Sequence, residues 1–136
     1  MNLEDFKDYI HVPKIWGEEI WLTNLPLYCA KFLALKDGFQ CSLHRHLRKT
    51  ETFFVLEGVV NLEVQADPDQ KVLTTIRLQA GDNYHLSTGV FHRFSTAKPG
   101  GAIILEVSTR HDDLDVERLE DSRTKPPSQS LTNKPD

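Results

Sequence analysis

Short segments that favour β-structure follow one another along most of the chain, with turn-forming residues between them. Residues 27–35 alternate between two faces, and residues 51–56 and 102–108 are rich in β-branched, aromatic and aliphatic side chains. Clusters of Gly, Pro, Asp and Lys separate such segments at steady intervals, which indicates an all-β barrel or sandwich. The predicted strands span residues 27–35, 40–46, 51–56, 59–64, 72–78, 84–86, 91–96 and 102–108.

The pattern changes near the C-terminus of the sequence. Acidic residues come early in Asp112–Glu120, which predicts a short C-terminal helix. Proline, serine and glutamine dominate after it, which predicts a disordered, flexible tail over residues 122–136. We therefore expect a single domain over residues 1–121, with the core of its functional site in residues 27–109.

Two histidines separated by one residue lie in a predicted strand. Side chains alternate faces along a strand, so His44 and His46 point the same way. Glu51 joins them only if Leu47–Thr50 forms a turn and Glu51 begins the returning strand. Two imidazoles and a carboxylate on adjacent strands then form a candidate site for a divalent metal ion.

The spacing of the Gly, His and Glu residues in Gly38–Gly58 resembles the first motif of the cupin superfamily. A second stretch, Gly81–Thr96, resembles the second cupin motif, with Ser87 where that motif usually has Pro and Thr96 where it often has Asn. The two motifs follow in the expected order and at the usual distance. The resemblance implies that His92 is a further metal ligand.

The cupin resemblance also implies a fold and a cofactor. The fold is an all-β cupin double-stranded β-helix, which is a jelly-roll barrel. The cofactor is one divalent metal ion, Mn²⁺, Zn²⁺, Co²⁺ or Fe²⁺, held by His44, His46, Glu51 and His92.

Two charged residues stand in otherwise apolar strands. Burying a lone charge is unfavourable unless it is paired or functional, so Glu106 and Lys31 either line the barrel interior beside the metal or form ion pairs at the sheet surface. In small cupin D-lyxose and related sugar isomerases, a lysine and a glutamate on the matching strands lie beside the metal. That resemblance favours a catalytic Glu106 and a catalytic Lys31.

Two further stretches resemble type II mannose-6-phosphate isomerases, although only in part. Lys14–Glu19 keeps the Trp-Gly pair of their first segment, and Leu105–Val107 followed by acidic residues resembles the end of their cupin domain. These resemblances imply a metal-dependent aldose–ketose isomerase, an intramolecular oxidoreductase that acts on a sugar or sugar phosphate through an enediolate. An Fe(II)-dependent cupin dioxygenase and a non-catalytic sugar- or metal-binding cupin are the alternatives.

Composition restricts the choice of partners. A net charge of −4 at pH 7 disfavours nucleic acid and anionic membranes, and no apolar run is long enough to span a bilayer. The acidic start does not resemble a secretory signal, so we expect a cytoplasmic protein in which Cys29 and Cys41 are reduced and buried. The exposed edge strands of a small barrel suggest a homodimer.

The remaining charged and histidine side chains are assigned simpler roles. His11 and His85 are expected to pack or to lie at the surface, since neither has a partner at chelating spacing, and His111 is left open. By alternation, Arg45 and Arg93 should point outward. Charged residues in loops are usually solvated, and they are also the candidates for binding a substrate phosphate: Arg48, Lys49 and Arg110.

Overall fold

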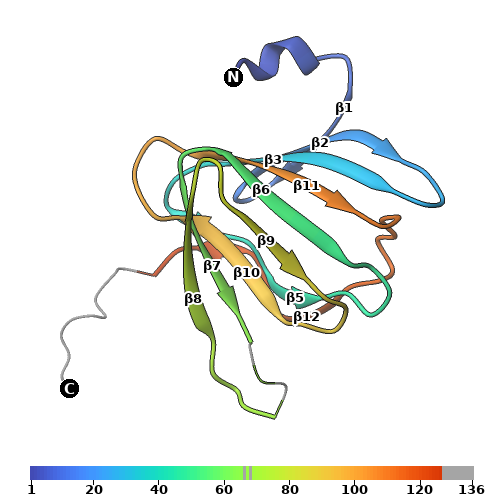
Figure 1. Cartoon of the computed structure of the whole chain (residues 1–136). Coiled ribbons are helices and arrows are strands. Elements are labelled where there is room, and N and C mark those ends of the chain that lie inside the picture. Colours follow the sequence, from blue (N-terminus) through green and yellow to red (C-terminus); the bar gives the residue numbers. More distant parts are fainter. Residues whose placement is uncertain (66, 68, 127–136) are drawn as a thin grey trace.

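Two antiparallel sheets face each other and enclose the interior of the protein (Figure 1). The computed structural model describes residues 1–65, 67 and 69–126. In the first sheet the strand order is β1-β2-β3-β11-β6-β9. Its strands are β1 (Ile10–Lys14), β2 (Gly17–Asn24), β3 (Cys29–Leu35), β11 (Ala102–Ser108), β6 (Glu51–Glu57) and β9 (Asn83–Leu86).

The second sheet has the order β12-β5-β10-β4-β13, and β7 pairs with the other edge of β10 and continues to β8. Its strands are β4 (Phe39–Gln40), β5 (Leu43–Arg45), β7 (Val59–Val64), β8 (Thr74–Gln79), β10 (His92–Thr96), β12 (Glu117–Glu120) and β13 (Arg123–Thr124). A single 3₁₀ turn, Leu3–Phe6, precedes β1. This two-sheet jelly-roll architecture confirms the predicted all-β class.

The predicted C-terminal helix is wrong. Within Asp112–Glu120 the chain makes a turn and then forms β12, which pairs antiparallel with β5. The free edge of β5 presents unpaired backbone groups, and a strand satisfies them where a helix could not. Long-range pairing therefore outweighs the local helical pattern.

The prediction of a disordered tail from residue 122 onward is wrong at its first residues. Arg123 and Thr124 form β13, which pairs with Gln40 and Phe39 of β4. Ordered structure therefore continues beyond the expected boundary at Asp121. The rest of the predicted tail, residues 127–136, lies outside the described residues.

The strand predicted over residues 40–46 is interrupted. Its two parts, β4 and β5, both pair with the same edge of β10, through Gln40 opposite Ser95 and His44 opposite His92. The break at Cys41 and Ser42 lets the chain bend while β10 keeps both parts in one sheet. No helix in the described part of the chain is long or apolar enough to cross a membrane.

Candidate metal centre

Three histidine side chains converge between the two sheets. His44 lies on β5 directly opposite His92 on β10, and His46 follows just after β5 ends. One ring nitrogen from each of the three lies within 4.8 Å of the others. The i, i+2 spacing thus brings His44 and His46 together as predicted, and strand pairing adds His92.

Backbone carbonyl groups fix the orientation of all three rings. Nδ1 of His44 lies 2.8 Å from the oxygen of Ser42, Nδ1 of His46 lies 2.7 Å from that of Asp115, and Nδ1 of His92 lies 2.9 Å from that of Val90. A carbonyl only accepts, so each Nδ1 donates, and each Nε2 is left with a free lone pair. Histidines that bind metals are commonly oriented in this way.

Burial disfavours the charged form of His44 and of His46, and an imidazole must be neutral to bind a metal ion. Burial and the neighbouring His92 lower the pKa of His44 to about 3, and burial also lowers the pKa of His46. Nε2 of His92 is buried and has no hydrogen-bond partner among the described residues. A buried, unpartnered lone pair beside two others fits a bound cation.

Glu51 begins β6, after the predicted turn, and is buried next to the histidines. Its Oε2 lies 3.2 Å from Nε2 of His92 and 3.5 Å from Nε2 of His46. Burial acts to raise the pKa of Glu51, but neighbouring groups, Lys49 among them, outweigh it and hold that pKa well below its ordinary value. Three imidazoles and one carboxylate suit a divalent transition-metal ion.

Glu106 on β11 is buried and belongs to a polar network. Its Oε2 accepts hydrogen bonds from Nζ of Lys49 at 3.0 Å and from the hydroxyl of Ser108 at 3.0 Å. Lys49 Nζ also lies 3.6 Å from Oε1 of Glu51. The carboxylate predicted to be catalytic is therefore linked to the metal-site carboxylate through one ammonium group.

Lys49 was expected to be solvated, and this expectation is wrong. The side chain is buried, and Glu106 and Glu51 raise its pKa against the opposing effect of burial. It also donates to Nδ1 of His111 at 3.0 Å, whose Nε2 then donates to Asp113 at 2.7 Å. His111, which the sequence left open, thus belongs to the network.

Asp115 holds the loop that follows His46. Its carboxylate accepts from the backbone N–H groups of Leu47, Arg48 and Lys49 at 2.8–3.2 Å. Those N–H groups outweigh burial and lower its pKa. Because its carbonyl also orients His46, Asp115 fixes both a histidine and Lys49. No local pattern identified Asp115, because its partners lie 66–69 residues away.

Lys31 on β3 is buried and points into the same interior. Its Nζ lies 3.2 Å from Oε1 of Glu19 and 4.4 Å from the centre of the Trp21 ring. The indole N–H of Trp21 also donates to Oε1 of Glu19 at 2.9 Å, and the pKa of Glu19 is lowered by Lys31 and Trp21 despite its burial. Lys31 is the neighbour of Glu106 in strand pairing, but its ion pair is with Glu19.

A cavity of about 420 Å³ brings most of these groups together. Its lining includes His44, His46 and Glu51 together with Lys31 and Glu106, so the structure brings the predicted catalytic residues into the space beside the predicted ligands. Lys49, which the sequence offered only as a candidate for binding a phosphate, and His111, which it left open, also line the cavity. Glu19, Trp21 and Asp113 line it as well and were not predicted. A cavity of this size can hold a small polar molecule.

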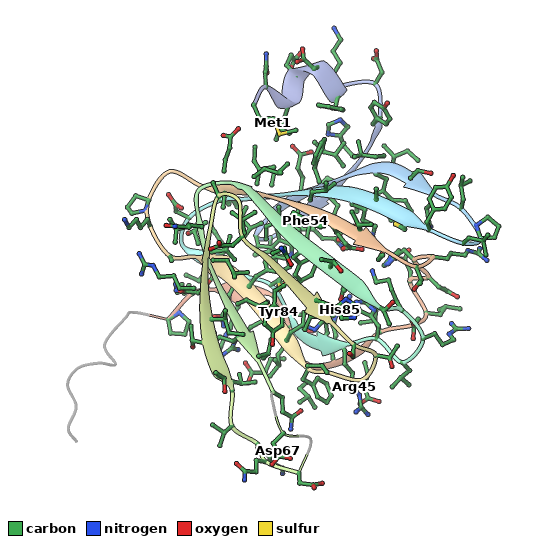
Figure 2. All side chains as sticks on the ribbon, viewed as in Figure 1. Met1, Arg45, Phe54, Asp67, Tyr84 and His85 are labelled. Carbon is green, nitrogen blue, oxygen red and sulfur yellow. The ribbon has the colours of Figure 1, made fainter. Side chains whose placement is uncertain are left out.

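The remaining predictions concern residues outside the cavity. Arg45 and Arg93 pair with Glu117 and Glu63, and Figure 2 places Arg45 on the outer side of the second sheet, as alternation predicts. His85 is exposed on β9 (Figure 2) and lies 3.1 Å from the Thr52 hydroxyl. The cysteines predicted to be reduced and buried are both buried free thiols: Cys29 and Cys41.

Comparisons with known proteins identify the fold that surrounds this site. A family model described as the cupin domain matches residues 32–108. No curated protein matches the chain.

Similar solved structures include oxalate decarboxylase from Bacillus subtilis, with a TM-score of 0.73, 16% identity and coverage of 84% of this chain and 31% of that one. KdgF from Halomonas sp. has a TM-score of 0.65 and 17% identity, with 80% and 93% covered. The capsular polysaccharide assembling protein CapF from Staphylococcus aureus has a TM-score of 0.75 and 15% identity, with 88% and 34% covered. The chain thus spans about a third of the decarboxylase and of CapF, and these similarities concern the fold.

Proposed function

The chain belongs to the cupin domain family, and from that premise we propose that it is a metal-dependent aldose–ketose isomerase acting on a small sugar or sugar phosphate. The observation that carries the proposal is the buried carboxylate of Glu106, which lines the same cavity as the histidine cluster. An isomerase of this kind needs a proton-transfer group beside a site that polarises the substrate oxygens.

The metal would be held by His44, His46, His92 and Glu51. Their neutral imidazoles and single carboxylate are suited to Mn²⁺, Zn²⁺, Co²⁺ or Fe²⁺. A bound divalent ion would supply positive charge to polarise the substrate carbonyl and to stabilise the negative charge that develops on its oxygens.

Glu106 would carry the proton between the two carbon atoms. Its carboxylate removes the proton from C2 of the aldose and returns it to C1, while a second proton passes from the oxygen on C2 to the oxygen on C1. The aldehyde at C1 becomes a hydroxymethyl group and C2 becomes a ketone, so no external oxidant is needed. Lys49 donates a hydrogen bond to Glu106 and so holds the carboxylate in position.

Lys31 would act on the substrate oxygens. Its buried ammonium lies on the cavity wall, where it can donate hydrogen bonds and offset the charge of the enediolate. Its pairing with Glu19 and the Trp21 ring restrains the side chain, so the ammonium is positioned before the substrate binds.

An Fe(II)-dependent dioxygenase is the second candidate, because three histidines and a carboxylate also suit iron and oxygen chemistry. Oxygen activation has no need of the buried Glu106–Lys49 pair, which is the observation that favours the isomerase. Oxygen uptake by the iron-loaded protein in the presence of sugars would support the dioxygenase.

Glu106→Gln tests the isomerase proposal, because it keeps the size of the side chain and removes its ability to accept a proton. We expect kcat to fall by about 10²–10⁴-fold with little change in KM, while metal content and Tm stay close to parental. Turnover is measured on metal-loaded protein with a panel of pentoses, hexoses and their phosphates. Glu57→Gln is the matched control, since Glu57 lies on β6 and pairs with the N-terminus outside the cavity.

A folded, metal-loaded Glu106→Gln protein with parental turnover would contradict the assigned role of Glu106. Absence of isomerisation across the whole panel by metal-loaded parent protein would contradict the isomerase itself. In both cases the metal site would stand, because metal content is measured separately.

A further inference from the structure

Charged side chains of both signs line the cavity in equal number. The acidic ones are Glu19, Glu51, Glu106 and Asp113, and the basic ones are Lys14, Lys31, Lys49 and Arg118. With neutral histidines the lining is therefore formally uncharged. A divalent ion at the histidines would give the cavity a net charge of about +2, which favours a ligand that carries negative charge.

Most of these charges already have partners inside the protein. Lys31 pairs with Glu19, Lys49 pairs with Glu106 and Glu51, and Asp113 accepts a hydrogen bond from His111. Among the described residues, Lys14 and Arg118 form no ion pair within 4.0 Å and no side-chain hydrogen bond. Two positive charges of the lining are thus available to a ligand.

These two residues line the cavity from different sheets. Lys14 ends β1, the edge strand of the first sheet, and Arg118 lies on β12, the edge strand of the second. Arg118 is the direct cross-strand partner of His44, and such partners project from the same face of a sheet. Its neighbour Glu117 pairs with Arg45 outside the barrel, so alternation directs Arg118 toward the cavity.

We infer that Lys14 and Arg118 form an anion subsite at the mouth of the cavity, and that the sugar of the proposed function is a phosphorylated sugar. The identification of the ligand as a sugar rests on the proposed function, while the anion subsite rests on the charges described above. A guanidinium fork and an ammonium group in one cavity lining suit a phosphate, which offers three terminal oxygens. A phosphate monoester carries about −1.5 to −2 charges at pH 7, which balances the loaded cavity.

The subsite is tested by calorimetric titration of the Zn²⁺-loaded protein with D-mannose, D-mannose 6-phosphate and inorganic phosphate. Isomerisation would not disturb the comparison, because both sugar isomers retain the phosphate. We expect the parent to prefer the phosphorylated sugar by about tenfold or more, as hydrogen bonds to charged groups imply. Arg118→Gln and Lys14→Gln should each reduce that preference, and the double variant should remove it.

Arg77→Gln is the matched control, because Arg77 lies on β8 and does not line the cavity. It should leave the preference unchanged. Titration of metal-free parent protein with inorganic phosphate supplies a readout that does not depend on the metal, and weak saturable binding that Arg118→Gln removes would support the subsite.

Three results would overturn the subsite: equal affinity of the parent for both sugars, no saturable phosphate binding, or a parental preference in the double variant. The last would mean that the metal alone binds the phosphate. None of these measurements requires turnover. A phosphate preference without isomerisation would therefore contradict the proposed reaction and support the subsite. Isomerisation without that preference would support the reaction and contradict the subsite.

Discussion

The inward faces of the central strands differ between their two ends. On β6, Glu51 lies at the polar end and Val55 lies in the apolar core. On β11, likewise, Glu106 lies toward the polar end and Ile104 lies in the apolar core. Strand pairing sets Glu106 opposite Lys31 of β3, and Ile104 opposite the apolar part of the same strand. The interior thus has a polar end with the candidate metal site and an apolar end with the core.

The contrast shows how one barrel combines a stable core with a buried cluster of charges. Burial of the apolar end is the main favourable contribution to folding. Burial of charge at the polar end is unfavourable unless each charge is paired, and the Lys49–Glu106 and Lys31–Glu19 pairs supply this compensation. The polar end therefore contributes less to the stability of the fold than the apolar end does.

Removing one member of a buried pair should have the largest effect on stability. Among the described residues, Lys49→Met leaves Glu106 with only the Ser108 hydroxyl as donor, and we expect the free energy of unfolding to fall by about 3–5 kcal/mol. Adding Glu106→Leu should restore much of that loss, because it removes the buried carboxylate that has lost its Lys49 partner. Urea unfolding of metal-free protein measures both, with exposed Lys98→Met as control. A double variant less stable than Lys49→Met would show that the charges themselves stabilise the fold.

A change in the apolar end should lower stability and leave metal binding intact. Leu62 on β7 is fully buried, and Leu62→Ala should reduce the free energy of unfolding by about 2–5 kcal/mol because it creates a cavity. Leu27→Ala is the matched control at an exposed leucine, where we expect a change within about 0.5 kcal/mol. Urea unfolding and a metal titration are compared for each. Loss of metal binding in a folded Leu62→Ala protein would mean that the two ends are not independent.

The smallest of the three effects concerns the residue that supports the metal site. Asp115→Asn removes the charge that holds the loop after His46, and we expect metal affinity to fall by about 10–100-fold. Competition with a chelator measures the dissociation constant. Asp121→Asn is the control on the same segment, and His92→Ala, which removes a proposed ligand, should weaken binding further. Parental affinity in a folded Asp115→Asn protein would exclude this supporting role.

Much of the fold could be predicted because its evidence is local. Strand composition and turn residues identified β3, β6, β7 and β11 to within a few residues, and the alternation of His44 and His46 placed both on one face. The segment that forms β12 could not be predicted in this way, because it takes its conformation from the unpaired edge of β5. The local pattern in Asp112–Glu120 favoured a helix that tertiary pairing replaced.

In the candidate site, too, some features could be predicted from local sequence and others could not. The spacing of His44, His46, Glu51 and His92 was recognisable, and the structure brings these four side chains together. The surroundings of Glu106 could not be predicted from the sequence, because its partner Lys49 is 57 residues away and lies in a segment with the composition of a solvated loop.

The sequence by itself indicated the β-class, most of the strands between residues 27 and 108, and His44, His46 and Glu51 as proposed metal ligands, while the resemblance to the cupin motifs added His92. Strand composition and the alternation of side chains depend on residue type and short spacing, which a linear pattern records. Only the tertiary structure decided which charges are buried, which are paired and which remain available, as for Lys14 and Arg118. The reason is physical: the free energy of a charge depends on its distance from other charges and from water, and folding sets both through contacts between residues far apart in the chain.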